Sequence, residues 1–185
     1  MVKRGAPPGT VQVGLLLGIH SIRNNRNTCI LIRYENADAT LRWAAERGMR
    51  ARGHCMFWAV PHAQTPDWVQ RLTGLQMVEA VKEHVDNLLD HFEGKLEGWD
   101  VNNEMLHGSF FTNQSGDDSI RLKMFQWSHE RSPELLLFVN DYNIIAGSES
   151  ARYCQLIQSL LDQGAPVSAI GVQVRESSLY LLFRI

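Results

Sequence analysis

The residues best suited to chemistry in this chain are a carboxyl group and two carboxamides that follow a short apolar stretch. Residues 99–107 read Trp-Asp-Val-Asn-Asn-Glu-Met-Leu-His, so Glu104 comes directly after Asn102 and Asn103. A carboxyl group at the exit of a buried parallel strand is a typical way to hold a general acid over a substrate in an α/β barrel. The pattern therefore predicts that Glu104 transfers a proton, with amide side chains beside it.

Polar side chains also follow three other stretches that are expected to be strands. These groups are Arg52 with His54, the run Asn140-Asp141-Tyr142-Asn143, and Gln173. Active sites of parallel barrels gather at the carboxyl ends of the strands. We therefore expect these groups and Glu104 to lie at one face of a barrel.

An alternation of helices and strands from residue 36 onward must position these groups. Apolar residues at three- and four-residue steps predict helices, and continuous apolar runs predict buried strands. A doubly wound sheet is the main alternative, but it would ordinarily carry a glycine-rich phosphate loop after an early strand, and no such loop occurs in the sequence. The predicted helices span 36–47, 76–92, 118–130 and 148–163, and the predicted strands span 49–58, 96–103, 135–139 and 167–173.

The composition narrows the classes of partner. The formal net charge of −2 over 185 residues provides no basic surface for nucleic acid, and no apolar run approaches the ~18 residues of a membrane span. Residues 3–19 weakly resemble a signal peptide, but prolines interrupt them and no small-residue cleavage site follows, so no signal peptide is expected.

Cys29, Cys55 and Cys154 lack metal-ligand spacing and are predicted to be free buried thiols. No cofactor, metal or obligate protein partner is expected.

Four successive motifs connect these observations. They are Arg52-Gly53-His54-x-x-x-Trp58, Trp99-Asp-Val-Asn-Asn-Glu104-x-x-His107-Gly108, Phe138-Val-Asn-Asp-Tyr-Asn143 and Gly164-Ala-Pro-Val-x-Ala-Ile-Gly-Val-Gln173. In this order and with this spacing, over residues 34–173, the chain resembles glycoside hydrolase family 10, the endo-β-1,4-xylanase family. The continuation from Met105 to Phe110 is most similar to the plant and animal branch.

The resemblance implies a TIM (β/α)8 barrel and retaining hydrolysis of β-1,4-linked xylan by two carboxyl groups, one acting as acid/base and one as nucleophile. It assigns the acid/base to Glu104 and a contact with the sugar 2-hydroxyl to Asn103. The same resemblance assigns further substrate contacts to His54, Trp58, Tyr142 and Gln173. A full-length parent is expected to be secreted.

The resemblance fails at both ends of the chain. The family carries its nucleophile on the seventh strand, whereas here Glu176 is the sole acid among the twelve residues after Gln173, and Arg175 stands where the family has His. Residues 1–33 show no counterpart of the early strands. We therefore expect an incomplete barrel of about four βα units over 34–173, with two open parallel edges, an unrelated or mispredicted segment at 1–33 and an aberrant tail at 174–185.

Alternative interpretations remain beside this one. The chain could be an inactive fragment or a non-catalytic remnant that binds carbohydrate, and the Glu104-x-x-His107 spacing also matches di-iron bundles, although no second copy is present. Trp58 and Trp68 are candidates for stacking on sugars. Asp141 is predicted to cap the turn after its strand, and His84 and His91 are predicted to be surface residues.

Overall fold

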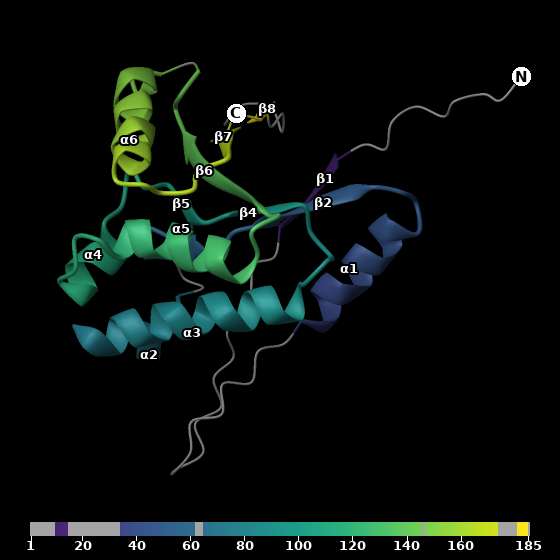
Figure 1. Cartoon of the computed structure of the whole chain (residues 1–185), viewed down its shortest axis with the longest axis horizontal. Coiled ribbons are helices and arrows are strands. Elements are labelled where there is room, and N and C mark those ends of the chain that lie inside the picture. The colour runs from purple at the N-terminus through teal and green to yellow at the C-terminus, as the bar shows by residue number, and fades with distance from the viewer. Residues whose placement is uncertain (1–9, 15–33, 62–64, 146, 174–180, 185) are drawn as a thin grey trace, which may run out of the picture.

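The structure, a computed structural model, describes residues 10–14, 34–61, 65–145, 147–173 and 181–184, and its centre is a sheet of mainly parallel strands (Figure 1). The main sheet has six strands in the order β1-β2-β4-β6-β7-β8, and β3 and β5 form a second, two-stranded sheet. The strands are β1 (Thr10–Gly14), β2 (Arg50–His54), β3 (Phe57–Trp58), β4 (Gly98–Asp100), β5 (Asn102–Asn103), β6 (Leu136–Tyr142), β7 (Ala169–Gln173) and β8 (Leu181–Arg184).

Helices connect successive parallel strands, as a βα repeat requires. The helices are α1 (Glu35–Ala45), α2 (Asp67–Gln70), α3 (Leu75–His91), α4 (Phe110–Ser115), α5 (Ile120–Arg131) and α6 (Ser150–Asp162). The predicted helices are confirmed as α1, α3, α5 and α6. Gly48 and Gly164 follow α1 and α6 and have the positive φ that is common just after a helix end. The described residues therefore form part of an α/β barrel with about four βα units, as predicted.

Two predicted strands are each divided in two. The stretch predicted at 49–58 forms β2 and β3, and the stretch at 96–103 forms β4 and β5. Between these pairs the backbone hydrogen bonds continue, because the N–H groups of Met56 and Phe57 donate to the carbonyl oxygens of Asp100 and Val101 at 2.9 and 3.1 Å. The divided strands thus still run side by side to the end that carries the polar residues.

The two ends of the described chain differ from the prediction. β1 pairs in parallel with β2, from Thr10 opposite Arg50 to Gly14 opposite His54, so part of the segment 1–33 joins the sheet that it was expected to lie outside. β8 pairs antiparallel with β7, so this edge of the sheet, which was predicted to be open, is occupied. The remaining residues of 1–33 and 174–185 lie outside the described residues.

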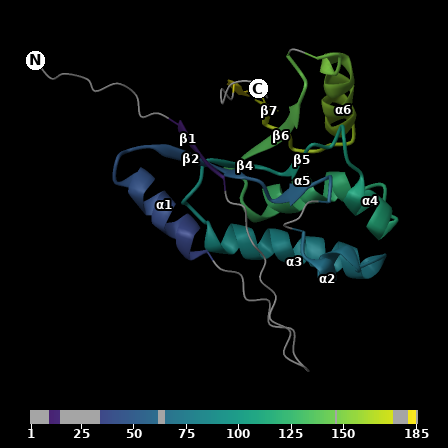
Figure 2. The ribbon, with the colours of Figure 1, turned by 180° about the vertical axis from the view of Figure 1, so that it is seen from behind.

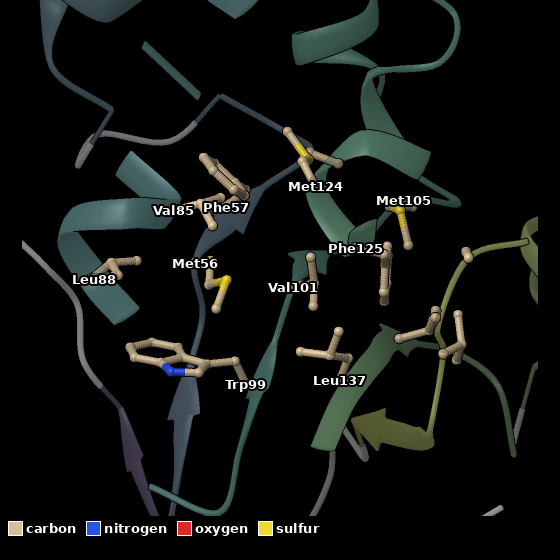
Figure 3. Close-up of a cluster of buried hydrophobic side chains, with 14 of the residues drawn as sticks. Met56, Phe57, Val85, Leu88, Trp99, Val101, Met105, Met124, Phe125 and Leu137 are labelled. Carbon is tan, nitrogen blue, oxygen red and sulfur yellow. The ribbon is translucent and has the colours of Figure 1, made fainter. Parts of the chain in front are cut away.

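The hydrophobic core lies between the strands and the helices α3 and α5, which pack side by side (Figure 1, Figure 2). Figure 3 shows Trp99 and Leu137 on their strands, with Val85 and Leu88 of α3 and Phe125 of α5 around the same cluster. Trp99 is fully buried, and its ring occupies the space that a side chain at Gly53 would need. Gly53, which interrupts the apolar pattern of the predicted strand, is therefore required by the packing of Trp99.

A tyrosine ties α6 to the strands that it covers. The hydroxyl group of Tyr153 lies 2.8 Å from the carbonyl oxygens of both Val139 on β6 and Gly171 on β7. Burial raises the pKa of this hydroxyl well above its usual value, so it remains a neutral donor. The contact fixes the spacing of β6 and β7 below the polar ends of these strands.

Two histidines on α3 are not the surface residues that were predicted. The ring of His84 packs against Phe57 and its Nε2 donates to the carbonyl oxygen of Met56 at 3.0 Å. Burial lowers the pKa of His84 to about 4, so the ring is neutral at pH 7. His91 is partly buried, stacks on Tyr34 and lies 2.9 Å from the carboxylate of Asp38 on α1.

Candidate active site

Glu104 lies at the carboxyl end of β5 in a backbone conformation that is uncommon for a residue other than glycine. Its φ is 61°, and its carbonyl oxygen accepts hydrogen bonds from the N–H groups of His107 and Gly108, both at 3.1 Å. Its own N–H donates to the carbonyl oxygen of Asn140 on β6 at 2.9 Å. Left-handed conformations of this kind are concentrated at functional sites, where the surroundings fix them. The backbone of Glu104 is held from both sides by a tight turn and by the neighbouring strand.

The Glu104 carboxyl group is oriented by a tryptophan from the adjacent strand. Nε1 of Trp58, on β3, donates a hydrogen bond to Oε2 of Glu104 at 2.7 Å. Both side chains are only partly buried, so the carboxyl group remains accessible. The structure therefore brings together two of the predicted site residues, Trp58 and Glu104.

Three carboxamides from three strands form a group that we call the amide cluster: Asn103 and Asn140, which are buried, and Gln173, which is partly buried. Oδ1 of Asn103 accepts hydrogen bonds from Nδ2 of Asn140 at 2.7 Å and from Nε2 of Gln173 at 2.9 Å. Because two donors hold this oxygen, the Asn103 amide cannot flip without losing both bonds. Its Nδ2 is buried and has no partner among the described residues. An unpartnered buried donor of this kind is what a ligand oxygen would satisfy.

Next to the amide cluster lies a buried ion pair that orients His54. Arg52 and Asp100 form a salt bridge with their side chains 2% and 0% exposed, and Oδ2 of Asp100 lies 2.6 Å from Nδ1 of His54. A carboxylate can only accept, so Nδ1 of His54 carries a proton and donates to Asp100. This leaves Nε2 as the ring nitrogen that can form a hydrogen bond with a ligand hydroxyl.

A second acid, Asp141, does more than cap the turn after its strand. Its Oδ1 accepts from the N–H of Tyr142 at 2.8 Å, as a turn cap would, but its Oδ2 accepts from the N–H of Leu106 at 2.8 Å. Oδ1 also lies 2.7 Å from Nδ1 of His107. The prediction of a local cap was therefore incomplete, because Asp141 also holds the loop that follows Glu104.

His107, which belongs to the Glu104-x-x-His107 motif, also lies at the site although it was not among the predicted site residues. Its ring stacks on Tyr142, with centroids 3.8 Å apart and planes at 13°. The partner residues lie 34 and 35 positions away in the sequence, so no local pattern indicates the contact. Burial raises the pKa of the Asp141 carboxyl above its usual value, while the N–H donors and His107 act in the opposite direction.

Two of the three cysteines lie in the part of the chain that the structure describes. Cys55 is a free, partly buried thiol whose pKa is raised well above its usual value by burial and by the nearby carboxyl groups of Asp100 and Glu104. Cys154 is free and exposed, so the expectation that it is buried was wrong, and Cys29 lies outside the described residues. Within the described ranges no group of three or more histidine, cysteine or acidic residues could hold a metal ion, and no helix there is long and apolar enough to cross a membrane.

Of the described carboxyl groups at these strand ends, Glu104 is the one that is accessible. Asp100 is bound by Arg52 and His54, and Asp141 is bound by the loop after Glu104 and by His107. Glu176 lies outside the described residues. The arrangement can hold a hydroxylated ligand through Asn103 and His54, and it can deliver a proton from Glu104.

Comparison with known proteins gives consistent matches. Residues 18–178 match the model of the family described as Glycosyl hydrolase family 10. Endo-1,4-beta-xylanase 2 of Arabidopsis thaliana is 41% identical over 144 residues, which are 76% of this chain and 13% of that protein. The Anti-sigma-I factor RsgI6 of Acetivibrio thermocellus is 38% identical over 142 residues, or 77% of this chain and 18% of that protein.

A solved structure agrees with the fold. The intracellular xylanase TsXylA of Thermoanaerobacterium saccharolyticum, in complex with xylotriose, superposes with a TM-score of 0.73 at 26% identity, covering 88% of this chain and 55% of that one. The chain thus spans about half the length of this structure and less than a fifth of the two relatives above. The family match begins at residue 18, before the boundary predicted at residue 34, and the predicted domain limits remain a prediction.

Proposed function

Because this chain belongs to glycosyl hydrolase family 10, we propose that its site binds β-1,4-linked xylose units and that Glu104 is the general acid/base of their hydrolysis. The observation that carries the proposal is the combination of an accessible Glu104 carboxyl, oriented by Trp58, with the unpartnered Nδ2 of Asn103 in the preceding position. In a retaining reaction the acid protonates the leaving oxygen while a second carboxylate attacks the anomeric carbon.

We propose a separate contact with the substrate for each of these residues. Asn103 donates to the 2-hydroxyl of the attacked sugar, Nε2 of His54 forms a hydrogen bond with a hydroxyl of the same sugar, and Trp58 both lines that position and holds Glu104. Gln173 would lie beside the nucleophile and Tyr142 would contact the next sugar. The xylotriose in the TsXylA structure supports xylo-oligosaccharides as the ligand class.

The nucleophile is not among the described residues, and we propose that residues 1–185 alone do not hydrolyse xylan at a normal rate. A small anion can replace a missing nucleophile, because it forms the new bond to the anomeric carbon while Glu104 gives its proton to the leaving oxygen. With azide and an aryl β-xylobioside, the expected products are the α-xylobiosyl azide, formed with inversion, and the free phenol.

This reaction tests the role of Glu104. Glu104→Gln should abolish azide-dependent cleavage of a phenyl xylobioside, whose leaving group needs protonation, and should spare a dinitrophenyl xylobioside. Glu130→Gln, on the exposed surface of α5, is the matched control. Equal loss on both substrates would contradict the acid/base role, and hydrolysis of xylan at normal rates by residues 1–185 would contradict the missing nucleophile.

The second candidate function is carbohydrate binding without turnover. It is favoured by a relative of similar identity that is named as an anti-sigma factor rather than as an enzyme. Binding of xylotetraose that is unchanged in Glu104→Gln, together with no azide-dependent cleavage by the unsubstituted chain, would favour this alternative.

A further inference from the structure

A charged side chain from outside the strands holds the turn that follows Glu104. Nη2 of Arg121, in the first turn of α5, donates a hydrogen bond to the carbonyl oxygen of Gly108 at 2.6 Å. Gly108 is also one of the two residues whose N–H groups donate to the carbonyl oxygen of Glu104. The turn that carries Glu104 is therefore bound to α5 at its far end.

The first turn of α5 is a firm base for this contact. Ile120 and Met124 are 0% exposed, so this part of the helix is fixed in the hydrophobic core. The helix of a βα unit runs back along its strand, so its first turn lies near the strand ends that carry the site. Arg121 therefore reaches the turn from a part of the fold that does not move easily.

The surroundings of the guanidinium strengthen its hydrogen bond. Arg121 is partly buried, and burial lowers the pKa of this side chain, while the nearby carboxyl group of Asp141 acts in the opposite direction. A guanidinium remains charged in proteins, and a charged donor forms a stronger hydrogen bond than a neutral one, the more so away from water. The contact with the Gly108 carbonyl oxygen can therefore restrain the turn.

Two side chains of opposite charge hold this turn from two elements. The carboxylate of Asp141, on β6, accepts from the N–H of Leu106 at 2.8 Å, and Arg121, on α5, donates to the carbonyl oxygen of Gly108. Each charge is matched to the backbone group that it binds. The turn after Glu104 is thus anchored at two points along its length.

The same glycine lies against the chain that carries Trp58. A Cβ at Gly108 would overlap the carbonyl group of Ala59, so the turn packs directly on the backbone that follows β3. The N–H of Phe110 donates to the carbonyl oxygen of Ala59 at 2.9 Å. Since Ala59 directly follows Trp58, the position of this glycine fixes the spacing between the segments that carry Trp58 and Glu104.

We propose that Arg121 is a positioning residue, which holds the Gly108 carbonyl group and thereby keeps the Glu104 carboxyl group within hydrogen-bond distance of the Trp58 indole. The inference rests on the proposed acid/base role of Glu104 and adds a residue that orients this group. Arg121 acts through the backbone of the turn and not through contact with the substrate.

The test uses residues 1–185 with ¹⁵N-labelled tryptophan and follows the indole N–H signal of Trp58 by NMR across the ionisation of Glu104. Trp58→Phe assigns the signal. His54, whose ring centroid lies 5.7 Å from that of Trp58, is another titratable group beside the indole. The part of the pH-dependent shift that disappears in Glu104→Gln is therefore taken as the signature of the Trp58–Glu104 hydrogen bond.

Arg121→Met keeps an apolar stem and removes the donors. It should reduce the signature by about twofold or more, because the carboxyl group is then no longer held at one distance from the indole. The other indole signals should keep their positions, which would show that the variant is folded. Arg121→Lys keeps a cationic donor on a flexible stem, so it should lose less of the signature than Arg121→Met.

Arg131→Met is the matched control, since it makes the same chemical change at the exposed end of α5. It removes an ion pair with Asp90 on the surface and should leave the signature unchanged.

Kinetic measurements separate positioning from a general loss of stability. In Arg121→Met, kcat for azide-dependent cleavage of a phenyl xylobioside should fall by about 10-fold while KM stays within about twofold, because the proton donor is misplaced and the sugar contacts remain. Cleavage of a dinitrophenyl xylobioside, whose leaving group needs no protonation, should change little.

The outcomes separate this inference from the proposed function. An unchanged signature in Arg121→Met would overturn the inference alone, as would losses of equal size in Arg121→Lys or in Arg131→Met. A pH-dependent shift of Trp58 that is the same in Glu104→Gln would also overturn it. A reduced signature in Arg121→Met, together with no azide-dependent cleavage by the unsubstituted chain, would support the positioning role and contradict the proposed function.

Discussion

The indole nitrogen of Trp58 donates a 2.7 Å hydrogen bond to Oε2 of Glu104, which joins two residues 46 positions apart in the sequence. Trp58 is on β3 and Glu104 follows β5, and these two strands are paired directly. The strand pairing therefore sets the position of the proton-transfer group that we propose. A substitution on one strand should change the chemistry performed from the other.

Trp58→Phe tests this dependence. Phenylalanine keeps an aromatic ring but lacks the donor, so the Glu104 carboxyl loses its fixed orientation. We expect azide-dependent cleavage of a phenyl xylobioside to fall by about 10-fold, with much less effect on a dinitrophenyl xylobioside. Trp43→Phe, on the exposed side of α1, serves as the control. Equal effects of Trp58→Phe on both substrates would show that the indole contributes only to sugar binding.

Asn140→Asp tests the amide cluster. The substitution replaces the Nδ2 donor with an oxygen that repels Oδ1 of Asn103, so the Asn103 amide should turn and withdraw its free Nδ2 from the ligand. We expect xylotetraose affinity, measured by calorimetry, to fall by about 10-fold, which corresponds to the loss of one hydrogen bond. Asn113→Asp on the exposed surface of α4 makes the same chemical change away from the site. Unchanged affinity in Asn140→Asp would contradict the orienting role.

Gly53→Ala tests the packing beneath the site. A Cβ at this position would lie 2.2 Å from Cε3 of the fully buried Trp99 ring, so the ring or the strand would have to shift. We expect a loss of about 3 kcal/mol in the free energy of unfolding, measured with urea. Gly48→Ala separates steric collision from backbone strain. Its φ is +66° with nothing within 4 Å, so it should cost only about 1 kcal/mol.

His84→Gln tests a pH dependence of stability. The pKa of His84 is lowered by burial from 6.5 to about 4, so below pH 6.5 the unfolded chain binds a proton that the folded chain excludes. Stability contributed by this site is therefore present above pH 6.5 and falls as the pH decreases to about 4, by no more than about 3 kcal/mol. The difference in unfolding free energy between pH 7 and pH 4 should be smaller in His84→Gln, and unchanged in the exposed control His129→Gln.

The helices could be predicted closely because their apolar faces are periodic. The residues Met77, Val81, Val85 and Leu88 bury one face of α3, as their spacing predicts. The strand ends could be predicted only in outline. The division of 49–58 into β2 and β3 depends on hydrogen bonds to β4 and β5, which a single stretch of sequence does not encode.

The types of residue in the candidate site could also be predicted, since polar groups after apolar runs indicate the active face of a barrel. The hydrogen-bond partners of these residues could not be predicted. Asp141 pairs with His107 and Leu106 across more than 30 positions, and the nearer turn cap was the simpler interpretation. His84 has the polar character of a surface residue, and only the packing against Phe57 shows otherwise.

The antiparallel pairing of β8 with β7 has a consequence for assembly. Phe183 opposite Ile170 and Leu182 opposite Gly171 occupy the hydrogen-bonding edge that the next parallel strand of a barrel would need. Any segment that extends the barrel past β7 must therefore compete with β8 for the same backbone groups. A further parallel strand could therefore pair with β7 only after β8 has left this edge.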